Sequence, residues 1–312
     1  MTDRPLKQIH LAAHFPGVNN TTVWSDPASG SHIEFDSFRH LAQTAERGKF
    51  DFLFLAEGLR LRETKGRIHD LDVVGRPESI TVLNALAAVT ERLGLAATAD
   101  VVFSRHSTFA DGQAFHADVK RRLAAYGRKP DELKIMPAAT FVLGDTDADA
   151  AERAAEIRRA QVGPQTTLNV LEQVWGVDLS DHDPDGPLPA VAPVPDSALV
   201  QGRVRIPDPL GTAERWRALA AEKGLSSREL VIEVTGRQSF IGSPATVAGQ
   251  IDHFVQQDAA DGFILVPHLT PGGLDEFVDR VVPLLQERGV FRTDYTGPTL
   301  RDHLGLPVPG RR

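Results

Sequence analysis

The stretch Arg92–His106 (RLGLAATADVVFSRH) limits the folds open to this chain more than any other. It runs apolar from Leu93 to Phe103, with Asp100 as its one charged residue. A continuous apolar run is typical of a parallel strand buried on both faces, but such strands span roughly 4 to 8 residues. The stretch is therefore either one unusually long strand or two strands without the helical crossover of about a dozen residues that joins parallel neighbours.

Strands and helices alternate on both sides of this stretch. Such alternation predicts a parallel sheet with helices outside, in a barrel or in a doubly wound sheet. We count five or six strands, whereas a closed (β/α) barrel typically has eight. Apolar runs predict strands at 9–15, 50–56, 135–143 and 262–267, and apolar residues at helical spacing predict helices at 35–47, 77–93, 109–126, 148–157, 168–175, 226–235, 244–255 and 274–285.

One segment departs from this pattern. Residues 181–195 contain five prolines, so we expect no regular structure there, but an excursion across the surface or a lid. The flanking segments belong to the same alternating pattern, and α/β barrels of this size commonly remain one domain. We therefore predict a single domain over residues 1–312, with a C-terminal tail at 290–312.

The composition excludes several classes of protein. A net charge of -8 gives no reason to expect nucleic acid or an anionic membrane as partner. The absence of cysteine excludes disulfides, thiolate metal ligands and a cysteine nucleophile, and it suits a reducing compartment. No signal-peptide pattern is present, and no stretch approaches the roughly 18 apolar residues of a membrane span. We expect a cytoplasmic protein.

Polar residues follow several of the predicted strands. Ligands of parallel α/β folds bind at the carboxyl ends of the strands, and those ends carry His14, Glu57, Asp100 or His106, and His268. Acids and imidazoles gathered there suit proton transfer or a metal, although polar residues also begin at strand ends for structural reasons alone. No HxH or HExxH pair is present, so we expect no metal site.

The segment Phe240–Pro244 (FIGSP) has two interpretations. Its backbone N–H groups stand at a helix start, where they suit a phosphate. Alternatively, Ser243 and Pro244 form an ordinary N-cap and first turn, which is the commoner meaning of this pair. No GxGxxG follows a strand and no GxxxxGK[ST] is present, so neither a Rossmann nucleotide site nor a P-loop is indicated.

Five longer stretches carry a family resemblance. These stretches are Leu41–Glu57, Ala85–Thr98, Gln113–Leu143, Gly242–Phe263 and Pro283–Leu306. Through them the chain resembles the flavin-dependent monooxygenases of the bacterial luciferase-like superfamily, in the group of nitrilotriacetate monooxygenase component A, dibenzothiophene sulfone monooxygenase and pristinamycin IIA synthase.

The resemblance implies a fold and an activity. The expected fold is an α/β protein, a luciferase-like (β/α) barrel shortened to five or six parallel strands. The expected activity is that of a two-component monooxygenase, in which a separate flavin reductase supplies reduced FMN and a small organic substrate is oxygenated by O2. In the family, further βα units stand between the segments that here meet at Thr98 and Val101. An internal deletion near residues 98–101 accounts for the overlong apolar run.

The resemblance also implies roles for single residues. Glu57 matches an aspartate near the flavin and Thr98 matches the threonine of an Ala-Thr-Ala motif, so both are expected to bind the cofactor. Phe15 and His268 are expected to face the substrate. No catalytic residue can be named from the sequence.

Other positions depart from the family pattern. Asp100 stands where a serine usually follows the motif, Asn19 and Asn20 stand where relatives often have histidines, and Arg237 with Gln238 replaces a His-Arg pair. These departures leave room for a second interpretation, in which the chain is a catalytically lost or repurposed remnant that acts as a binding protein. An open parallel sheet exposes unpaired edges, so a second copy is the natural cover and we expect a homo-oligomer, most simply a homodimer.

Overall fold

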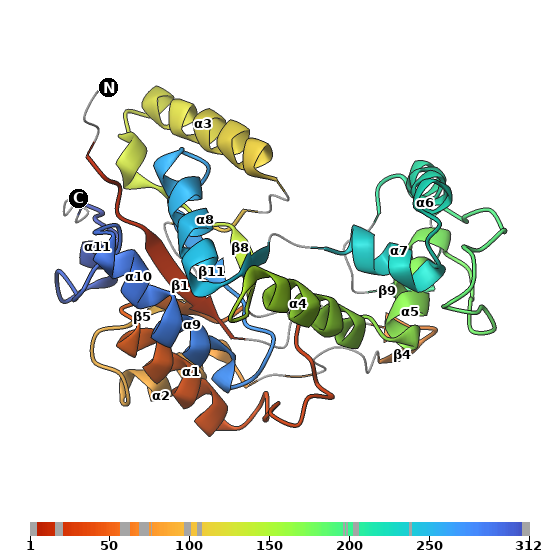
Figure 1. The fold of residues 1–312 in the computed structure, drawn as a ribbon, viewed down its shortest axis with the longest axis horizontal. Coiled ribbons are helices and arrows are strands. Elements are labelled where there is room, and N and C mark those ends of the chain that lie inside the picture. The colour runs from red at the N-terminus through yellow and green to blue at the C-terminus, as the bar shows by residue number, and fades with distance from the viewer. Residues whose placement is uncertain are drawn as a thin grey trace.

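The structure is a computed structural model (Figure 1). It describes residues 5–15, 21–56, 63–68, 75, 77–96, 101–104, 108–195, 197, 199–201, 206–236 and 239–307. Within these residues, no helix combines the length and the apolar character needed to cross a membrane.

A six-stranded sheet forms the centre of the molecule, and each neighbouring pair within it is parallel. This confirms the predicted α/β class and agrees with the predicted five or six parallel strands, although β10 was not among the segments predicted as strands. In spatial order the strands are β10 (Ser239–Gly242), β8 (Ala138–Leu143), β11 (Gly262–Leu265), β1 (His10–His14), β2 (Phe52–Phe54) and β5 (Gly94–Ala96).

The apolar stretch that opened the sequence analysis contains two strands. The first is β5, at the edge of the central sheet, and the second is β6 (Val101–Val102), which pairs in parallel with β7 (Lys134–Ile135). Only residues 97–100, which lie outside the described residues, stand between them. Four residues cannot include a helical crossover, so the second interpretation of the stretch is correct.

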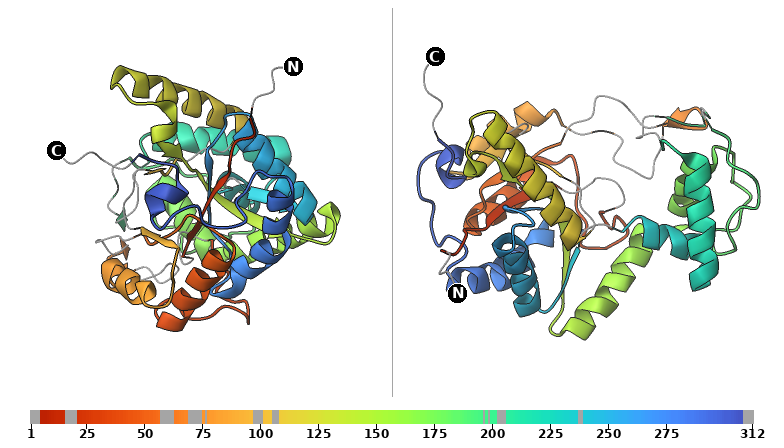
Figure 2. Two further views of the ribbon diagram at one scale, coloured as in Figure 1. Left: turned by 90° about the vertical axis from the view of Figure 1, so that its left-hand side faces the viewer. Right: turned by 90° about the horizontal axis from the view of Figure 1, so that it is seen from above.

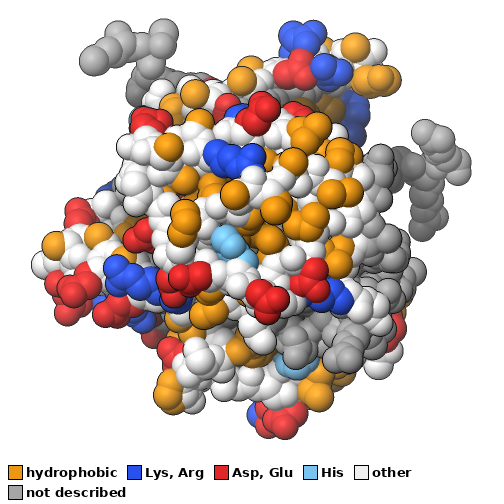
Figure 3. All heavy atoms as spheres, turned by 90° about the vertical axis from the view of Figure 1, so that its right-hand side faces the viewer, with side chains coloured by type: hydrophobic (Ala, Val, Ile, Leu, Met, Phe, Trp, Pro, Cys, Tyr) orange, Lys and Arg blue, Asp and Glu red, His pale blue; other side chains and the backbone are white. Residues whose placement is uncertain are grey.

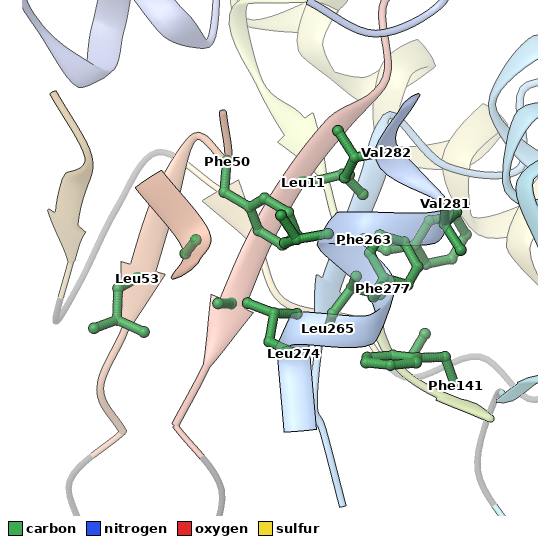
Figure 4. Packing of buried hydrophobic residues seen from close by; sticks show 14 of the residues in the cluster. Leu11, Phe50, Leu53, Phe141, Phe263, Leu265, Leu274, Phe277, Val281 and Val282 are labelled. Atoms are coloured by element: carbon green, nitrogen blue, oxygen red, sulfur yellow. The ribbon is translucent and has the colours of Figure 1, made fainter. Parts of the chain in front are cut away.

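Helices cover one face of the sheet, which we call the outer face. On α1, the residues Phe38, Leu41, Ala42 and Ala45 recur at helical spacing and are all buried. They join one large hydrophobic cluster with residues such as Leu53 and with the other helices (Figure 4). The helices of this face are α1 (Phe35–Arg47), α2 (Ser79–Ala87), α8 (Pro244–Gln256), α9 (Asp275–Arg280) and α10 (Val282–Glu287), while α3 (Phe109–Ala125) and α4 (Asp147–Gln161) follow β6 and β8.

The C-terminal segment covers the other, inner face of the sheet. Alternate strand residues such as Phe52 and Ile264 point to this face and pack against Leu304 and Leu306, which follow the short helix α11 (Leu300–His303). In the left panel of Figure 2, which looks at the molecule from the side where β1 begins, α11 lies in front of the amino ends of the strands. The predicted tail is therefore part of the fold, since it packs against the strands.

A helical lobe extends away from the sheet (Figure 1). It contains α5 (Pro164–Trp175), α6 (Pro209–Lys223), α7 (Ser227–Val234) and the described segments between them, and it has its own hydrophobic cluster around Trp175. Residues 181–195 have no helix or strand, as their prolines predict, and they wrap this lobe. The Trp175 Nε1–H donates to the oxygen of Val191 (3.0 Å), and the N–H of Ser227 donates to the oxygen of Gly186 (2.8 Å).

Apolar side chains mix with charged ones on the outward surface of this lobe (Figure 3).

A hairpin of two short strands, β3 (Glu63–Thr64) and β4 (Arg67–Ile68), lies against the lobe, where it pairs in antiparallel fashion with β9 (Val200–Gln201).

Candidate functional site

Three aromatic rings meet where β1, β2 and β6 end, at the carboxyl edge of the parallel strands. The ring centroids of His14 and Phe54 lie 5.3 Å apart, those of Phe54 and Phe103 lie 5.9 Å apart, and those of His14 and Phe103 lie 6.5 Å apart. His14 is buried, but Phe103 is 42% exposed. We call these three residues the aromatic platform, because one of its rings is open to a ligand.

The platform lies on the inner face of the sheet. Along the strands, it stands two residues beyond Ala12 and Phe52 of the hydrophobic cluster on that face. His14 follows Ala12 and Phe54 follows Phe52 at a spacing of two residues, so each points to the same face as its predecessor. The next residue after the platform, Ser104, is 6% exposed, and its Oγ has no hydrogen-bond partner among the described residues. An aromatic platform of this kind suits a flat, conjugated ligand.

His268 follows β11, the neighbour of β1 in the sheet. Its Nδ1 is buried without a hydrogen-bond partner among the described residues, and its backbone oxygen accepts the N–H of Val23 at 2.9 Å. Burial and the positive charge of Arg153 lower the pKa of His268 to about 4. The imidazole is therefore neutral at pH 7 and can offer either a donor or an acceptor to a ligand.

The protonation of His268 gives a testable pH dependence. Its folded-state pKa of about 4 lies below the value of about 6.5 for an unfolded histidine, so the unfolded chain binds the proton first as pH falls. Titration of His268 therefore does not change the free energy of unfolding above about pH 6.5. Between that pH and about 4, it lowers the free energy of unfolding progressively. Urea unfolding measures the free energy of unfolding at pH 7 and at pH 5. The decrease between the two pH values should be smaller for His268→Gln than for the unmodified protein. An imidazole that titrates near pH 6.5 in an NMR experiment would contradict this.

The other site residues named from the sequence do not all join this arrangement. Phe15 is 1% exposed, and its ring stacks on Phe38 of α1 at a centroid distance of 3.9 Å. Because it is one residue beyond His14, it points to the outer face and lies in the hydrophobic core. The structure therefore places Phe15 apart from the aromatic platform, on the opposite face of the sheet.

The remaining candidates cannot be placed. Glu57 and Thr98, the two expected cofactor contacts, lie outside the described residues, and so do Asn19, Asn20, Asp100, His106, Arg237 and Gln238. Across the part of the chain that is described, no three His, Cys, Asp or Glu side chains are grouped so that they could hold a metal ion.

The helix start at Ser243 is an ordinary cap. The Asp147 carboxylate accepts the backbone N–H of Ser243 at 2.7 Å and the hydroxyl of Thr246 at 3.0 Å. These hydrogen bonds lower the pKa of Asp147. Since a carboxylate already occupies the N-terminus of α8, the phosphate interpretation of Phe240–Pro244 is not supported.

Comparison with known proteins finds one matching family. The model of the luciferase-like monooxygenase family matches residues 17–110 and 96–262. The two matches overlap at 96–110, within the stretch where β5 and β6 follow each other almost directly. The split agrees with the internal deletion expected near residues 98–101.

Individual relatives give the same result. Nitrilotriacetate monooxygenase component A of Aminobacter aminovorans is 38% identical over 218 residues, which are 69% of this chain and 46% of that protein. Overall, the chain spans about half the length of the curated relatives it matches.

Solved structures with this fold include DmoA from Hyphomicrobium sulfonivorans (TM-score 0.75, 18% identity, covering 96% of this chain and 92% of that one). A riboflavin lyase solved with modified FMN and riboflavin has a TM-score of 0.71 at 18% identity, covering 98% of each chain.

Proposed function

Because the chain belongs to the luciferase-like monooxygenase family, we propose that it is a two-component flavin-dependent monooxygenase that uses reduced FMN and O2 to oxygenate a small organic substrate. The observation that carries this proposal is the aromatic platform. It stands at the carboxyl edge of the parallel strands, where ligands of such folds bind, and the exposed ring of Phe103 offers a surface to a flat ring system.

The residues present fit the ring portion of a flavin. Reduced FMN, when bound, supplies the electrons that activate O2. The side chains of His14, Phe54 and Phe103 would pack against the ring and exclude water from it. From the family resemblance we keep Glu57 and Thr98 as proposed cofactor contacts.

His268 is the proposed substrate contact. It follows β11, which lies beside β1 and so beside the strand end that carries His14. As a neutral imidazole in a largely buried position, it would orient a substrate through one hydrogen bond. Arg153 contributes the positive charge that helps to keep it unprotonated.

The proposal includes partners. A two-component enzyme needs a flavin reductase to supply reduced FMN. The edge strands β5 and β10 each have one side unpaired within the central sheet, so a second copy is the proposed cover for at least one of them. The cytoplasmic location remains a prediction from the composition.

Fluorescence titration with FMN, first oxidised and then reduced with dithionite, tests the proposal. We expect saturable binding of reduced FMN, and we expect Phe103→Ala to weaken it about two- to tenfold, the range of one aromatic contact. Phe115→Ala, at an exposed ring on α3, is the control and should bind as the unmodified protein does. A reductase-coupled oxygen-uptake assay would follow, with nitrilotriacetate as the first substrate tried. Failure to bind FMN in both redox states would contradict the proposal.

The open sheet favours a second candidate function. A chain that has lost catalysis but keeps two sheet edges would act as a binding or oligomer-forming protein. Sedimentation of the same sample separates the two candidates. A stable oligomer that binds no flavin would favour the remnant, whereas a folded monomer at micromolar concentration would remove its support.

A further inference from the structure

Lys134 is a partly buried lysine that the proposed function does not use. It lies on β7 and pairs with Val101 of β6 in the parallel register of these two strands. Within the described part of the chain, its ammonium has no hydrogen bond or ion pair. Burial disfavours the charged form of a lysine, so a partly buried ammonium usually has a counter-charge. Lys134 lacks one, and its surroundings give the reason.

The carboxylate that acts most strongly on Lys134, that of Asp261, is bound by other groups. Its Oδ2 lies 2.8 Å from the ammonium of Lys120 and accepts the backbone N–H of Ile135 at 2.8 Å. Its Oδ1 lies 3.4 Å from His116 Nε2. Both carboxylate oxygens therefore have partners from α3 or from β7 itself, and Lys134 is left without a direct counter-charge.

A second lysine is fixed beside the start of β7. Besides its pairing with Asp261, the ammonium of Lys120 donates to the backbone oxygens of Pro130 at 2.7 Å and of Leu133 at 2.6 Å. Leu133 directly precedes Lys134 in the chain. Three acceptors thus hold one positive charge where it acts on the second lysine, and like charges disfavour each other's charged forms.

The charged groups around Lys134 oppose one another. Burial has the largest effect on the pKa of Lys134 and lowers it, and the positive charge of Lys120 acts in the same direction. The carboxylates of Asp261, Asp131 and Asp51 act to raise this pKa, but they do not outweigh burial. A lysine is a nucleophile only as the free amine, and lysines that are desolvated or stand beside another cation are activated in this way. Lys134 combines both conditions.

We propose that Lys134 is a modification site, whose amine is acylated by small acyl phosphates. The nitrogen attacks the acyl carbon, so that a C–N bond forms while the C–O bond to the phosphate breaks. Phosphate leaves with the electron pair of that bond, and the nitrogen releases a proton to solvent, which leaves a neutral amide. Because Lys134 is only partly exposed, a small donor can reach its amine better than a bulky one. The reaction requires no flavin.

Incubation of the protein with acetyl phosphate at pH 8, followed by mass spectrometry of its peptides, measures the acetylation rate of each lysine. Two lysines serve as comparisons. Lys129 is exposed and has no ion pair within the described residues, whereas the side chain of Lys223 is 47% exposed and pairs with Glu233, which raises its pKa. We expect Lys134 to react at least about fivefold faster than either, since each unit by which a lysine pKa falls gives about tenfold more free amine. A rate no higher than that of Lys129 would overturn the proposal.

The pH dependence of acetylation separates reactivity from access. The rate at any lysine follows its fraction of free amine, and it levels off once the pH passes the pKa of that lysine. We expect the rate at Lys134 to level off at a lower pH than the rate at Lys129. Rates that rise in parallel for both lysines up to about pH 10, near the ordinary lysine pKa, would overturn the proposal even if Lys134 were the faster one.

Lys120→Met tests the cause of the reactivity. This change removes the neighbouring positive charge and frees the Asp261 carboxylate to pair with Lys134, so acetylation of Lys134 should become several-fold slower. Lys129→Met is the matched control and should leave the rate at Lys134 unchanged. An unchanged rate in Lys120→Met, with a melting temperature that shows a folded protein, would overturn the activation of Lys134 by its surroundings. If Lys120→Met does not fold, the pH dependence in the unmodified protein still decides the proposal.

Discussion

Replacing Asp51 with alanine is expected to lower the free energy of unfolding by about 3–5 kcal/mol, the cost of breaking a buried ion pair by removing one partner. Asp51 is 0% exposed and stands directly before β2. Its carboxylate accepts the N–H of Leu11 at 2.9 Å, contacts His10 Nδ1 at 3.2 Å and pairs with Arg292. Its removal leaves the guanidinium of Arg292 buried without a counter-charge. Urea unfolding followed by circular dichroism would measure the loss.

Asp294→Ala is the matched control for this prediction. Asp294 pairs with Lys49, but its side chain is 81% exposed, so its loss should cost less than about 1 kcal/mol. Equal unfolding midpoints for the two variants would contradict the predicted role of Asp51.

The same carboxylate should contribute to stability in a pH-dependent way. Burial acts to raise the pKa of Asp51, but the charges and hydrogen bonds of His10 and Arg292 outweigh it, and the pKa is lowered. Its contribution is therefore complete above the unfolded-state value of about 3.9 and is lost as pH falls through the lower folded-state pKa. Asp51→Asn should remove this part of the acid sensitivity.

Replacing Gly262 with alanine is expected to destabilise the protein by at least about 3 kcal/mol, the upper end of the cost of overpacking. An added Cβ would stand 1.9 Å from the backbone oxygen of His10 and 2.6 Å from its carbonyl carbon. Neither atom can move without separating β1 from β11, because His10 pairs with Gly262 in the register of these strands. We expect little folded protein, or a large fall in the urea midpoint.

Gly163→Ala provides the comparison for Gly262. Nothing lies within 4 Å of a Cβ placed at Gly163, and its φ is negative. Because Gly163 is the N-cap residue of α5, where glycine is preferred to alanine, its replacement should cost about 1 kcal/mol at most. If Gly262→Ala were tolerated as well as this control, the close approach of the two strands would be wrong.

The parallel sheet and its overlong apolar stretch could be predicted from the sequence because both depend on local pattern. The residues 92–106 were too long for one strand, and they do form β5 and β6. The face of the sheet to which a single strand residue points was harder to predict from the sequence. Both faces of a parallel sheet are buried, so hydropathy does not distinguish them. Phe15 and His14 are neighbours in sequence, but the first lies in the core and the second joins the aromatic platform.

The helical lobe and its attachment were not accessible to sequence reasoning, because they depend on contacts between distant residues. Lys65 and Asp178 stand 113 residues apart, and no local pattern relates them. Phe103 was predicted as part of an apolar run, which is typical of the core, but it is exposed beside the end of β6. The signal that could have indicated the hairpin is Lys65-Gly66, where glycine follows a polar residue between two short segments.

The pairing of β1 with β11 also determines the order in which this protein can be built. Leu11 and Ala12 pair with Phe263 and Ile264, about 250 residues later in the chain, so one side of the first strand has no neighbour until most of the polypeptide has left the ribosome. Contacts of such long range slow folding and keep apolar strand edges accessible to other chains in the meantime. Recombinant yield should therefore respond to slower synthesis at low temperature and to chaperones that shield the nascent chain.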